Sequence, residues 1–186
     1  MNETIQTILN RRSIRAYKQE QIKDDDLQII LNAGMYAPSA MNQQSWHFTA
    51  VQNKETLQKI NQTIKSYFLK SGNQRFEDMA KSENFNILYS APTLIIVSGD
   101  EKAIAPQCDS VLAMGNMFLA ASSIGIGSCW IHAITQLSSS EQGNTLISEL
   151  GIPTGNKIFA SGVFGYPAVA APTATPRKEN SVNIIR

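Results

Sequence analysis

Three arginines and a serine lie within five residues near the start of the chain, in the segment Arg11–Arg15. The planar guanidinium group of arginine donates two parallel hydrogen bonds, which suits this side chain to holding a phosphate. Ser13 adds a hydroxyl donor, and the apolar Ile14 between the polar residues indicates that one side of the segment faces the core. The pattern therefore predicts a site for a small anion. The alternative is a basic surface that is solvated or salt-bridged.

A second polar stretch, residues 37–48, contains serine, asparagine and glutamine and runs into an expected strand at 46–51. The side chains of Asn42, Gln43 and Gln44 can each donate and accept hydrogen bonds. Neutral groups of this kind in an enclosed loop suit a heterocycle whose edge alternates donors and acceptors. The alternative is an ordinary polar surface loop.

The composition indicates one globular domain, residues 1–186. Hydrophobic residues make up 42% of the chain and charged residues 17%, and this length allows a sizeable core. The formal net charge of +1 provides no large field for nucleic acid or a membrane surface, so neither is an expected partner. The arginine cluster is therefore a local feature.

The N-terminal residues Met1–Thr4 lack the basic and apolar pattern of a signal peptide, and no apolar run has the length of a membrane span. The two cysteines, Cys108 and Cys129, have no metal-binding spacing. We therefore expect a cytoplasmic protein with two free thiols and no metal site.

Apolar periodicity predicts the elements that position these stretches. Helices are expected over 4–9, 24–37, 54–71, 106–124 and from about 138 to 150, and strands over 46–51, 91–98 and 158–164. Residues 72–84 are expected to form a connection or short helices. The C-terminal residues 182–185 are expected to add an edge strand or to reach a partner.

The helix expected over 106–124 is apolar almost all round, with several methionines and alanines. A helix that is apolar on every face is buried on every side. Because so small a chain can hardly cover it alone, we infer a homodimer in which a second subunit covers one face. The competing interpretation is a central helix wrapped by its own chain.

Four blocks of sequence, in this order, resemble the FMN-dependent nitroreductase family. They are Arg11–Arg15, Pro38–Trp46, Gly125–His132, and Gly165–Pro167 followed by Pro176–Lys178. The resemblance implies an α+β fold with a mainly antiparallel sheet flanked by helices, forming an intertwined homodimer. It also implies tightly bound FMN at the dimer interface, with NADH or NADPH as transient electron donor.

At matching positions the resemblance implies that Arg11, Ser13 and Arg177 hold the FMN phosphate, with Lys178 as a further candidate. Arg12 matches a looser position, toward the phosphate or the ribityl chain. The resemblance places Arg15 near the pyrimidine edge of the flavin. A fixed cation there stabilises the reduced, anionic flavin.

The same resemblance assigns flavin contacts to Pro38, Ser39 and Asn42, Ser39 from the second subunit, with Gln44 supporting their loop. Ser45 stands where family members often have proline, which implies a looser loop.

The backbone of Ile131, His132 and Ala133 is implied to run past flavin N5. Some family members have an acidic residue where this chain has His132. Its imidazole either tunes the flavin or merely packs near it.

The resemblance implies a ping-pong oxidoreductase that reduces nitroaromatics, quinones or similar flat acceptors, with FMN rather than a side chain carrying the chemistry. No GxGxxG motif follows a strand, so the nicotinamide donor is expected to bind transiently. Two alternatives keep the flavin: a specialised flavin reductase, dehalogenase or oxidase, and a flavin-binding sensor with little turnover. A third is a dimer without flavin whose arginines hold another phosphate.

Overall fold

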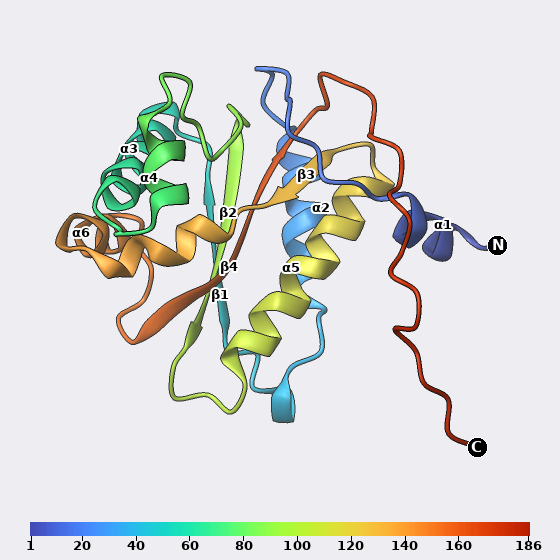
Figure 1. Ribbon diagram of the computed structural model, residues 1–186. Helices are drawn as coiled ribbons and strands as arrows, with labels where there is room; N and C mark the ends of the chain where they lie inside the picture. The colour runs from blue at the N-terminus through green and yellow to red at the C-terminus, as the bar shows by residue number, and fades with distance from the viewer.

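A four-stranded antiparallel sheet divides the molecule into two layers in the computed structural model, which describes residues 1–186 (Figure 1). The strands are β1 (Trp46–Val51), β2 (Thr93–Asp100), β3 (Gly127–Trp130) and β4 (Asn156–Gly165), and their order across the sheet is β1-β2-β4-β3. Every pairing in the sheet is antiparallel. The expected strands at 46–51, 91–98 and 158–164 are confirmed with shifts of one or two residues, and β3 is an addition.

The central position of β2 follows from its sequence. Leu94, Ile95, Ile96 and Val97 form an unbroken run of large aliphatic side chains, and all four are fully buried. A strand of this kind must be covered on both faces, as a central strand is. β2 accordingly has β1 on one side and β4 on the other.

Six α-helices and two 3-10 helices surround the sheet. They are α1 (Glu3–Asn10), α2 (Asp24–Met35), η1 (Ala40–Asn42), α3 (Lys54–Leu69), α4 (Gln74–Lys81), α5 (Pro106–Ser123), η2 (His132–Ser139) and α6 (Glu141–Glu149). In Figure 1, α3, α4 and α6 lie on one face of the sheet and α2 and α5 on the other. Each face has its own hydrophobic cluster. None of these helices combines the length and the hydropathy that crossing a bilayer requires.

The segment 72–84 contains a helix with its own start signal. The Asn73 side chain caps α4 by accepting hydrogen bonds from the backbone N–H groups of Arg75 (3.1 Å) and Phe76 (3.4 Å). Of the two outcomes expected for this segment, the structure therefore has a short helix, which packs against α3.

The helix α5 is covered on one side only within the chain. Met114 and Met117 are fully buried against the sheet and α2, whereas Val111 and Leu112 on the outer side are 41% and 47% exposed. No residue of α1 is buried at all, although this helix carries a clear apolar stripe. The chain therefore does not wrap its own central helix, and an apolar surface remains open over α1 and α5.

The C-terminal tail, residues 168–186, is exposed and forms no helix or strand. It leaves β4 beside the N-terminal segment and extends past α1 (Figure 1). The edge strand considered for residues 182–185 is not present.

Tight packing between η2 and α6 provides a test of the fold. A Cβ added at Gly143 would lie 1.7 Å from the Leu137 carbonyl oxygen, so Gly143→Ala must push these helices apart. We expect a loss of about 2–3 kcal/mol in the free energy of unfolding, measured by urea denaturation. Gln142→Ala, at the exposed neighbouring position, should change it by no more than about 0.5 kcal/mol. Equal stability of the two variants would contradict this packing.

Candidate functional site

The arginine-rich segment is attached to the edge strand β3. The Ile14 N–H donates to the Ser128 carbonyl (3.0 Å), and Ser13 pairs with Ser128 in a parallel bridge. Ile14 is 5% exposed and packs so closely on Gly127 that a Cβ there would lie 3.0 Å from the Ile14 Cβ. The expected anchoring role of Ile14 is confirmed, and Gly127 is the residue that makes room for it.

Tyr17 fixes the far end of the same segment. Its hydroxyl donates to the Ile14 carbonyl (2.5 Å), and burial raises its pKa, so it remains a neutral donor. At this end the backbone of the segment also pairs with the residues just after β4, through a bridge between Tyr17 and Pro167. The segment is thus held from both sides before any ligand is considered.

The arginines of this segment have no acidic partner. The ion pairs in the chain are Lys59–Glu149 and Lys81–Asp78, both elsewhere. The Arg11 guanidinium instead lies over the Phe118 ring, 5.8 Å from its centroid. The salt-bridged alternative for the cluster is therefore excluded, and its positive charge is left for an anion or for solvent.

Arg12 differs from its neighbours, because its guanidinium is used by the chain itself. Its Nη1 donates to the carbonyl oxygens of Leu9 (2.7 Å) and Arg11 (2.8 Å) at the end of α1. These are among the carbonyls that a helix C-terminus leaves without intrahelical partners. Arg12 therefore closes α1 and orients the residues that follow.

Cys129 lies under the segment and is 3% exposed. Burial raises the pKa of its thiol, and the nearby positive charge of Arg15 only partly opposes this. A neutral buried thiol is a poor nucleophile, so Cys129 acts as packing beneath the arginines.

The loop after α2 is held at the opposite end of α5. Asp109 Oδ1 accepts the Ala40 N–H (3.0 Å), and its Oδ2 accepts the Ser45 hydroxyl (2.9 Å). Phe118, beneath Arg11, comes nine residues later, or about 13 Å along the helix axis. One chain therefore does not bring the loop that contains Ser39 to its own Arg11.

This loop has an unusual backbone. Met41, Asn42 and Gln44 have φ values of 50°, 54° and 48°, a left-handed region that side-chain-bearing residues rarely adopt. The loop is braced from within: Ser39 Oγ accepts the Gln44 N–H (3.0 Å), and Gln44 Nε2 donates to Asn42 Oδ1 (3.1 Å). Strain of this kind persists where surrounding structure fixes it, and it is commonly found at functional sites.

Asp109 is the functional candidate that the sequence reasoning missed. It is 2% exposed, and it is the one acidic residue in the otherwise apolar and neutral α5. A single acidic residue in an apolar helix was the feature of the sequence that could have identified it. Its bond to Ser45 also corrects an expectation, because the serine ties the loop to α5 instead of loosening it.

The chain from β3 into η2 lies next to the arginine segment. Ile131 exchanges two hydrogen bonds with Ser161 of β4: its N–H donates to the serine carbonyl (3.0 Å), and its carbonyl accepts the serine hydroxyl (2.6 Å). The Ile131 N–H is therefore occupied. At the start of η2, His132 and Ala133 supply the backbone N–H groups that a helix N-terminus leaves free.

A cavity of about 620 Å³ opens beside this backbone. Its walls come from α3, α4, the segment before β2, and the β3–η2 junction, and they are mainly apolar and aromatic. The lining residues are Phe68, Phe76, Met79, Ser82, Asn84, Phe85, Asn86, Ile87, Tyr89, Trp130, Ile131, His132, Ala133 and Gln136. The sequence patterns gave no sign of this cavity.

Tyr89 connects the cavity to the arginine segment, since the Arg15 guanidinium lies over its ring at 5.9 Å from the centroid. Tyr89 and Ser90 both have left-handed backbones, with φ of 53° and 54°. Neighbouring amides hold this turn: Asn86 Nδ2 donates to Ser90 Oγ (2.9 Å), and Gln19 Nε2 to the Ser90 carbonyl (3.4 Å).

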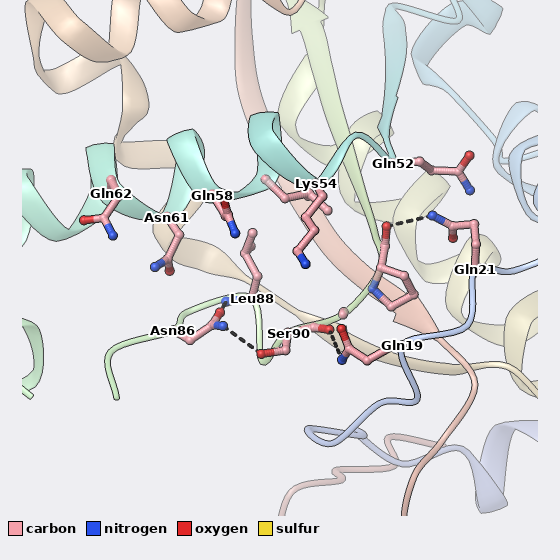
Figure 2. A pocket seen from close by; sticks show the side chains of 13 residues that line it. Gln19, Gln21, Gln52, Lys54, Gln58, Asn61, Gln62, Asn86, Leu88 and Ser90 are labelled. Carbon is pink, nitrogen blue, oxygen red and sulfur yellow. Dashed lines mark hydrogen bonds between the residues drawn. The ribbon is translucent and has the colours of Figure 1, made fainter. Parts of the chain in front are cut away.

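A separate hollow of about 280 Å³ lies beside residues 86–92 (Figure 2). Amide side chains dominate its lining, but several of them bond to their own chain. Gln21 Nε2 donates to the Pro92 carbonyl (3.0 Å), and Asn61 Nδ2 to the Phe85 carbonyl (3.3 Å). We therefore assign these amides to bracing residues 85–92, and with them Tyr89.

The tail arginine lies apart from the N-terminal cluster. Arg177 is exposed, and its Nη2 donates to the Thr175 carbonyl (2.9 Å). Lys178 is also exposed. The structure places neither of them in a contact with Arg11. No group of three or more histidine, cysteine, aspartate or glutamate side chains is arranged to hold a metal ion.

Comparison with known proteins agrees with this geometry. The sequence pattern of the Nitroreductase family matches residues 8–166. The chain is similar to the structure of a nitroreductase with bound FMN from Bacteroides fragilis, at 40% identity and a TM-score of 0.95, each chain being covered in full. It is 30% identical to an FMN reductase [NAD(P)H] from Bacillus subtilis, over 90% of this chain and 67% of that protein. A nitroreductase with bound FMN from Desulfitobacterium hafniense has 28% identity and a TM-score of 0.89, again over the whole of both chains.

The chain therefore belongs to the Nitroreductase family. The family match covers the arginine segment from Arg11, the strained loop, and the β3–η2 junction. It ends at Tyr166, before the tail that carries Arg177.

The hydrogen bonds of Asp109 give a test of how the loop is held. Asp109→Ala leaves the Ala40 N–H and the Ser45 hydroxyl without acceptors, so the free energy of unfolding should fall by about 2 kcal/mol. Hydrogen exchange across residues 38–45 should become faster. Gln107→Ala, at an exposed position of the same turn, is the control and should change neither. Unchanged protection of the loop in the Asp109 variant would show that something else holds it.

Proposed function

We propose that this protein is an FMN-dependent oxidoreductase that takes electrons from NADH or NADPH and passes them to nitroaromatics, quinones or similar flat acceptors. Family membership and the likeness to FMN-bound nitroreductases support this proposal. The observation that carries it is the pair of guanidinium groups without an acidic partner, Arg11 and Arg15, on a segment that is bonded to β3 beside an apolar cavity. A phosphate and a flat ring joined by a chain match that combination.

The residues present fit FMN. In our proposal Arg11 and Ser13 hold its phosphate, and Arg177 closes over it from the tail with Lys178 as a further contact. Arg12 orients this group from the end of α1, where its own hydrogen bonds hold it. Arg15 faces the pyrimidine edge of the ring.

A homodimer completes the proposed site. Pro38, Ser39 and Asn42 reach the cofactor of the other subunit, in a loop that Gln44 supports. The distance along α5 between this loop and Arg11 supports a shared site, as does the apolar surface left open over α1 and α5. The proposal treats residues 1–186 as one domain, and its two free cysteines suit the reducing cytoplasm.

When bound, FMN supplies the two-electron chemistry, and the side chains provide position and charge. Arg15 keeps a positive charge where negative charge develops on reduction. The N–H groups of His132 and Ala133, free at the start of η2, would donate to the bound cofactor, and the apolar cavity would exclude water from it. For a quinone the overall change is NAD(P)H + H⁺ + quinone → NAD(P)⁺ + hydroquinone. Because both substrates must use the same open face, the donor leaves before the acceptor binds.

Anaerobic absorbance titration of the purified protein with NADH and with NADPH tests the function directly. We expect a flavin band near one FMN per chain that bleaches on addition of donor. A flavin band that does not bleach would favour a sensor or a specialised oxidase, and no band after adding FMN would overturn the proposal.

Substitution of Arg11 tests the phosphate site. Arg11→Ala removes charge-assisted hydrogen bonds, so FMN should bind about 10- to 100-fold more weakly in a fluorescence titration. Arg75→Ala, an exposed arginine of α4, should leave FMN affinity unchanged. Equal affinities for both variants would remove Arg11 from the site.

A charge placed on α5 tests the shared site. Leu112→Glu should give a monomer of 20.4 kDa with little bound FMN, while the parent protein sediments at twice that mass. Leu69→Glu is the control, because this residue is similarly exposed (43% against 47%) but lies on α3, across the sheet. A parent protein that is monomeric and still full of FMN would contradict the shared site.

A further inference from the structure

We propose that Tyr89 is a positioning residue, whose ring holds the Arg15 guanidinium in place and thereby raises the reduction potential of bound FMN. This role rests on the proposed function, in which Arg15 faces the pyrimidine edge of the cofactor. It adds what fixes the arginine and which property of the cofactor depends on it. It also explains the strained turn that contains Tyr89 and Ser90.

The Tyr89 ring is the contact that holds the Arg15 side chain. Arg15 is exposed and belongs to neither of the two ion pairs of the chain. Its guanidinium lies over the Tyr89 ring, 5.9 Å from the centroid, which is within the range of a cation–π attraction. A long exposed side chain without a partner samples many rotamers. Tyr89 therefore limits where the positive charge of Arg15 can lie.

Tyr89 is itself held in a strained conformation. Tyr89 and Ser90 have φ of 53° and 54°, in a left-handed region that residues with side chains seldom adopt. The Tyr89 N–H donates to the Asn86 carbonyl (3.3 Å). The Ala91 N–H donates to the Leu88 carbonyl (3.0 Å). Strain of this kind persists where the surrounding structure fixes it, and it is often stored at functional sites. The strain is explained if the position of the Tyr89 ring matters.

The segment that carries Arg15 also holds this turn (Figure 2). Gln19 Nε2 donates to the Ser90 carbonyl (3.4 Å), and Gln21 Nε2 donates to the Pro92 carbonyl (3.0 Å). Both glutamines follow Arg15 closely in the sequence. The guanidinium and the aromatic ring therefore belong to two segments that are bonded to each other, and this fixes their relative position.

The position of this charge matters for the electron chemistry. A fixed cation beside the pyrimidine edge favours the reduced, anionic cofactor over the oxidised one. At an effective dielectric constant of about 20, moving a unit charge from about 4 to about 6 Å from an opposite charge changes such an equilibrium about tenfold. For a two-electron couple, a tenfold change corresponds to about 30 mV. Release of Arg15 from Tyr89 should therefore lower the midpoint potential by about this amount.

The test measures the midpoint potential of the full-length protein saturated with FMN, by dithionite titration against a reference dye. Tyr89→Leu removes the ring, so the reduced cofactor should lose about tenfold in affinity relative to the oxidised one, and the potential should fall by about 30 mV. Tyr89→Phe keeps the ring and should restore the parent potential. In the Arg15→Gln background, which lacks the charge, Tyr89→Leu should change nothing further, because Tyr89 acts through Arg15.

The brace of the turn offers a second route to the same result. Asn86 Nδ2 donates to Ser90 Oγ (2.9 Å), and Asn86 Oδ1 accepts the Leu88 N–H (3.0 Å). Asn86→Ala removes both bonds and leaves the Tyr89 ring in place in the sequence. Hydrogen exchange across residues 88–91 should become faster, and the potential should fall in the same direction. This variant decides the matter if Tyr89→Leu does not fold, which thermal melting checks.

Phe85→Leu is the matched control. Phe85 lines the same cavity as Tyr89 and also lies under a cation at 5.9 Å, but that cation is Lys65 of α3 and not a residue of the arginine segment. Its loss should leave the midpoint potential unchanged, which separates the loss of an aromatic wall from the loss of the partner of Arg15.

Four results would overturn the inference. They are a parent potential in Tyr89→Leu, an equal fall in Tyr89→Phe or in Phe85→Leu, a further fall when Tyr89→Leu is added to Arg15→Gln, and an unchanged potential in Asn86→Ala despite faster exchange. A protein that takes no FMN, or that NAD(P)H does not reduce, would instead overturn the proposed function, so the two failures are distinguishable.

Discussion

The site depends on the close contact between Ile14 and Gly127. The backbone bond from Ile14 to Ser128 fixes the register of the arginine segment on β3, and the missing side chain at Gly127 lets the two strands of chain approach. Arg11 and Arg15 lie on either side of Ser13, the first with its guanidinium over Phe118 of α5 and the second with its guanidinium over Tyr89. If this contact were loosened, the two guanidinium groups would lose their fixed positions relative to each other. An anion site built from long, flexible side chains needs such a rigid base, because each ordered arginine costs conformational entropy.

The helix α5 connects the arginine segment to the strained loop that contains Ser39. Near its C-terminal end, Phe118 lies under Arg11, and near its N-terminal end Asp109 holds Ala40 and Ser45. A buried carboxylate without a cation is tolerated only because two donors satisfy it. The loop thereby has a fixed conformation before any second subunit arrives. In the proposed dimer, this preorganisation means that little further ordering is required when the loop meets the partner's cofactor.

Local patterns in the sequence predicted the elements but not the cavity. Periodicity located most of the helices and strands within a few residues, since it follows directly from which side chains face the core. The arginine cluster was also visible, because its members are neighbours in sequence. The cavity was not, since Phe68, Phe85 and Trp130 come from three separate segments of the chain and meet only after folding. Asp109 was missed for a related reason: its meaning lies in a contact with Ala40, 69 residues earlier. The open face of α5 was predicted only in part. Its apolar character was visible in the sequence, but only the fold could show which side stays uncovered.

The two parts of the proposed site, the arginines and the cavity walls, bind by different interactions. Fixed charge, from Arg11 and Arg15, suits a cofactor that must stay bound, because charge-assisted hydrogen bonds are strong and directional. The cavity walls offer mainly dispersion and desolvation, which are weaker and less directional. That difference suits a site where donor and acceptor must alternate, since a tightly held product would block the next substrate. No basic side chain lines this cavity, so in the proposed mechanism only the ring of the nicotinamide cofactor enters it. Weak, mainly apolar contact with the cavity walls therefore lets donor and acceptor follow one another in the same place.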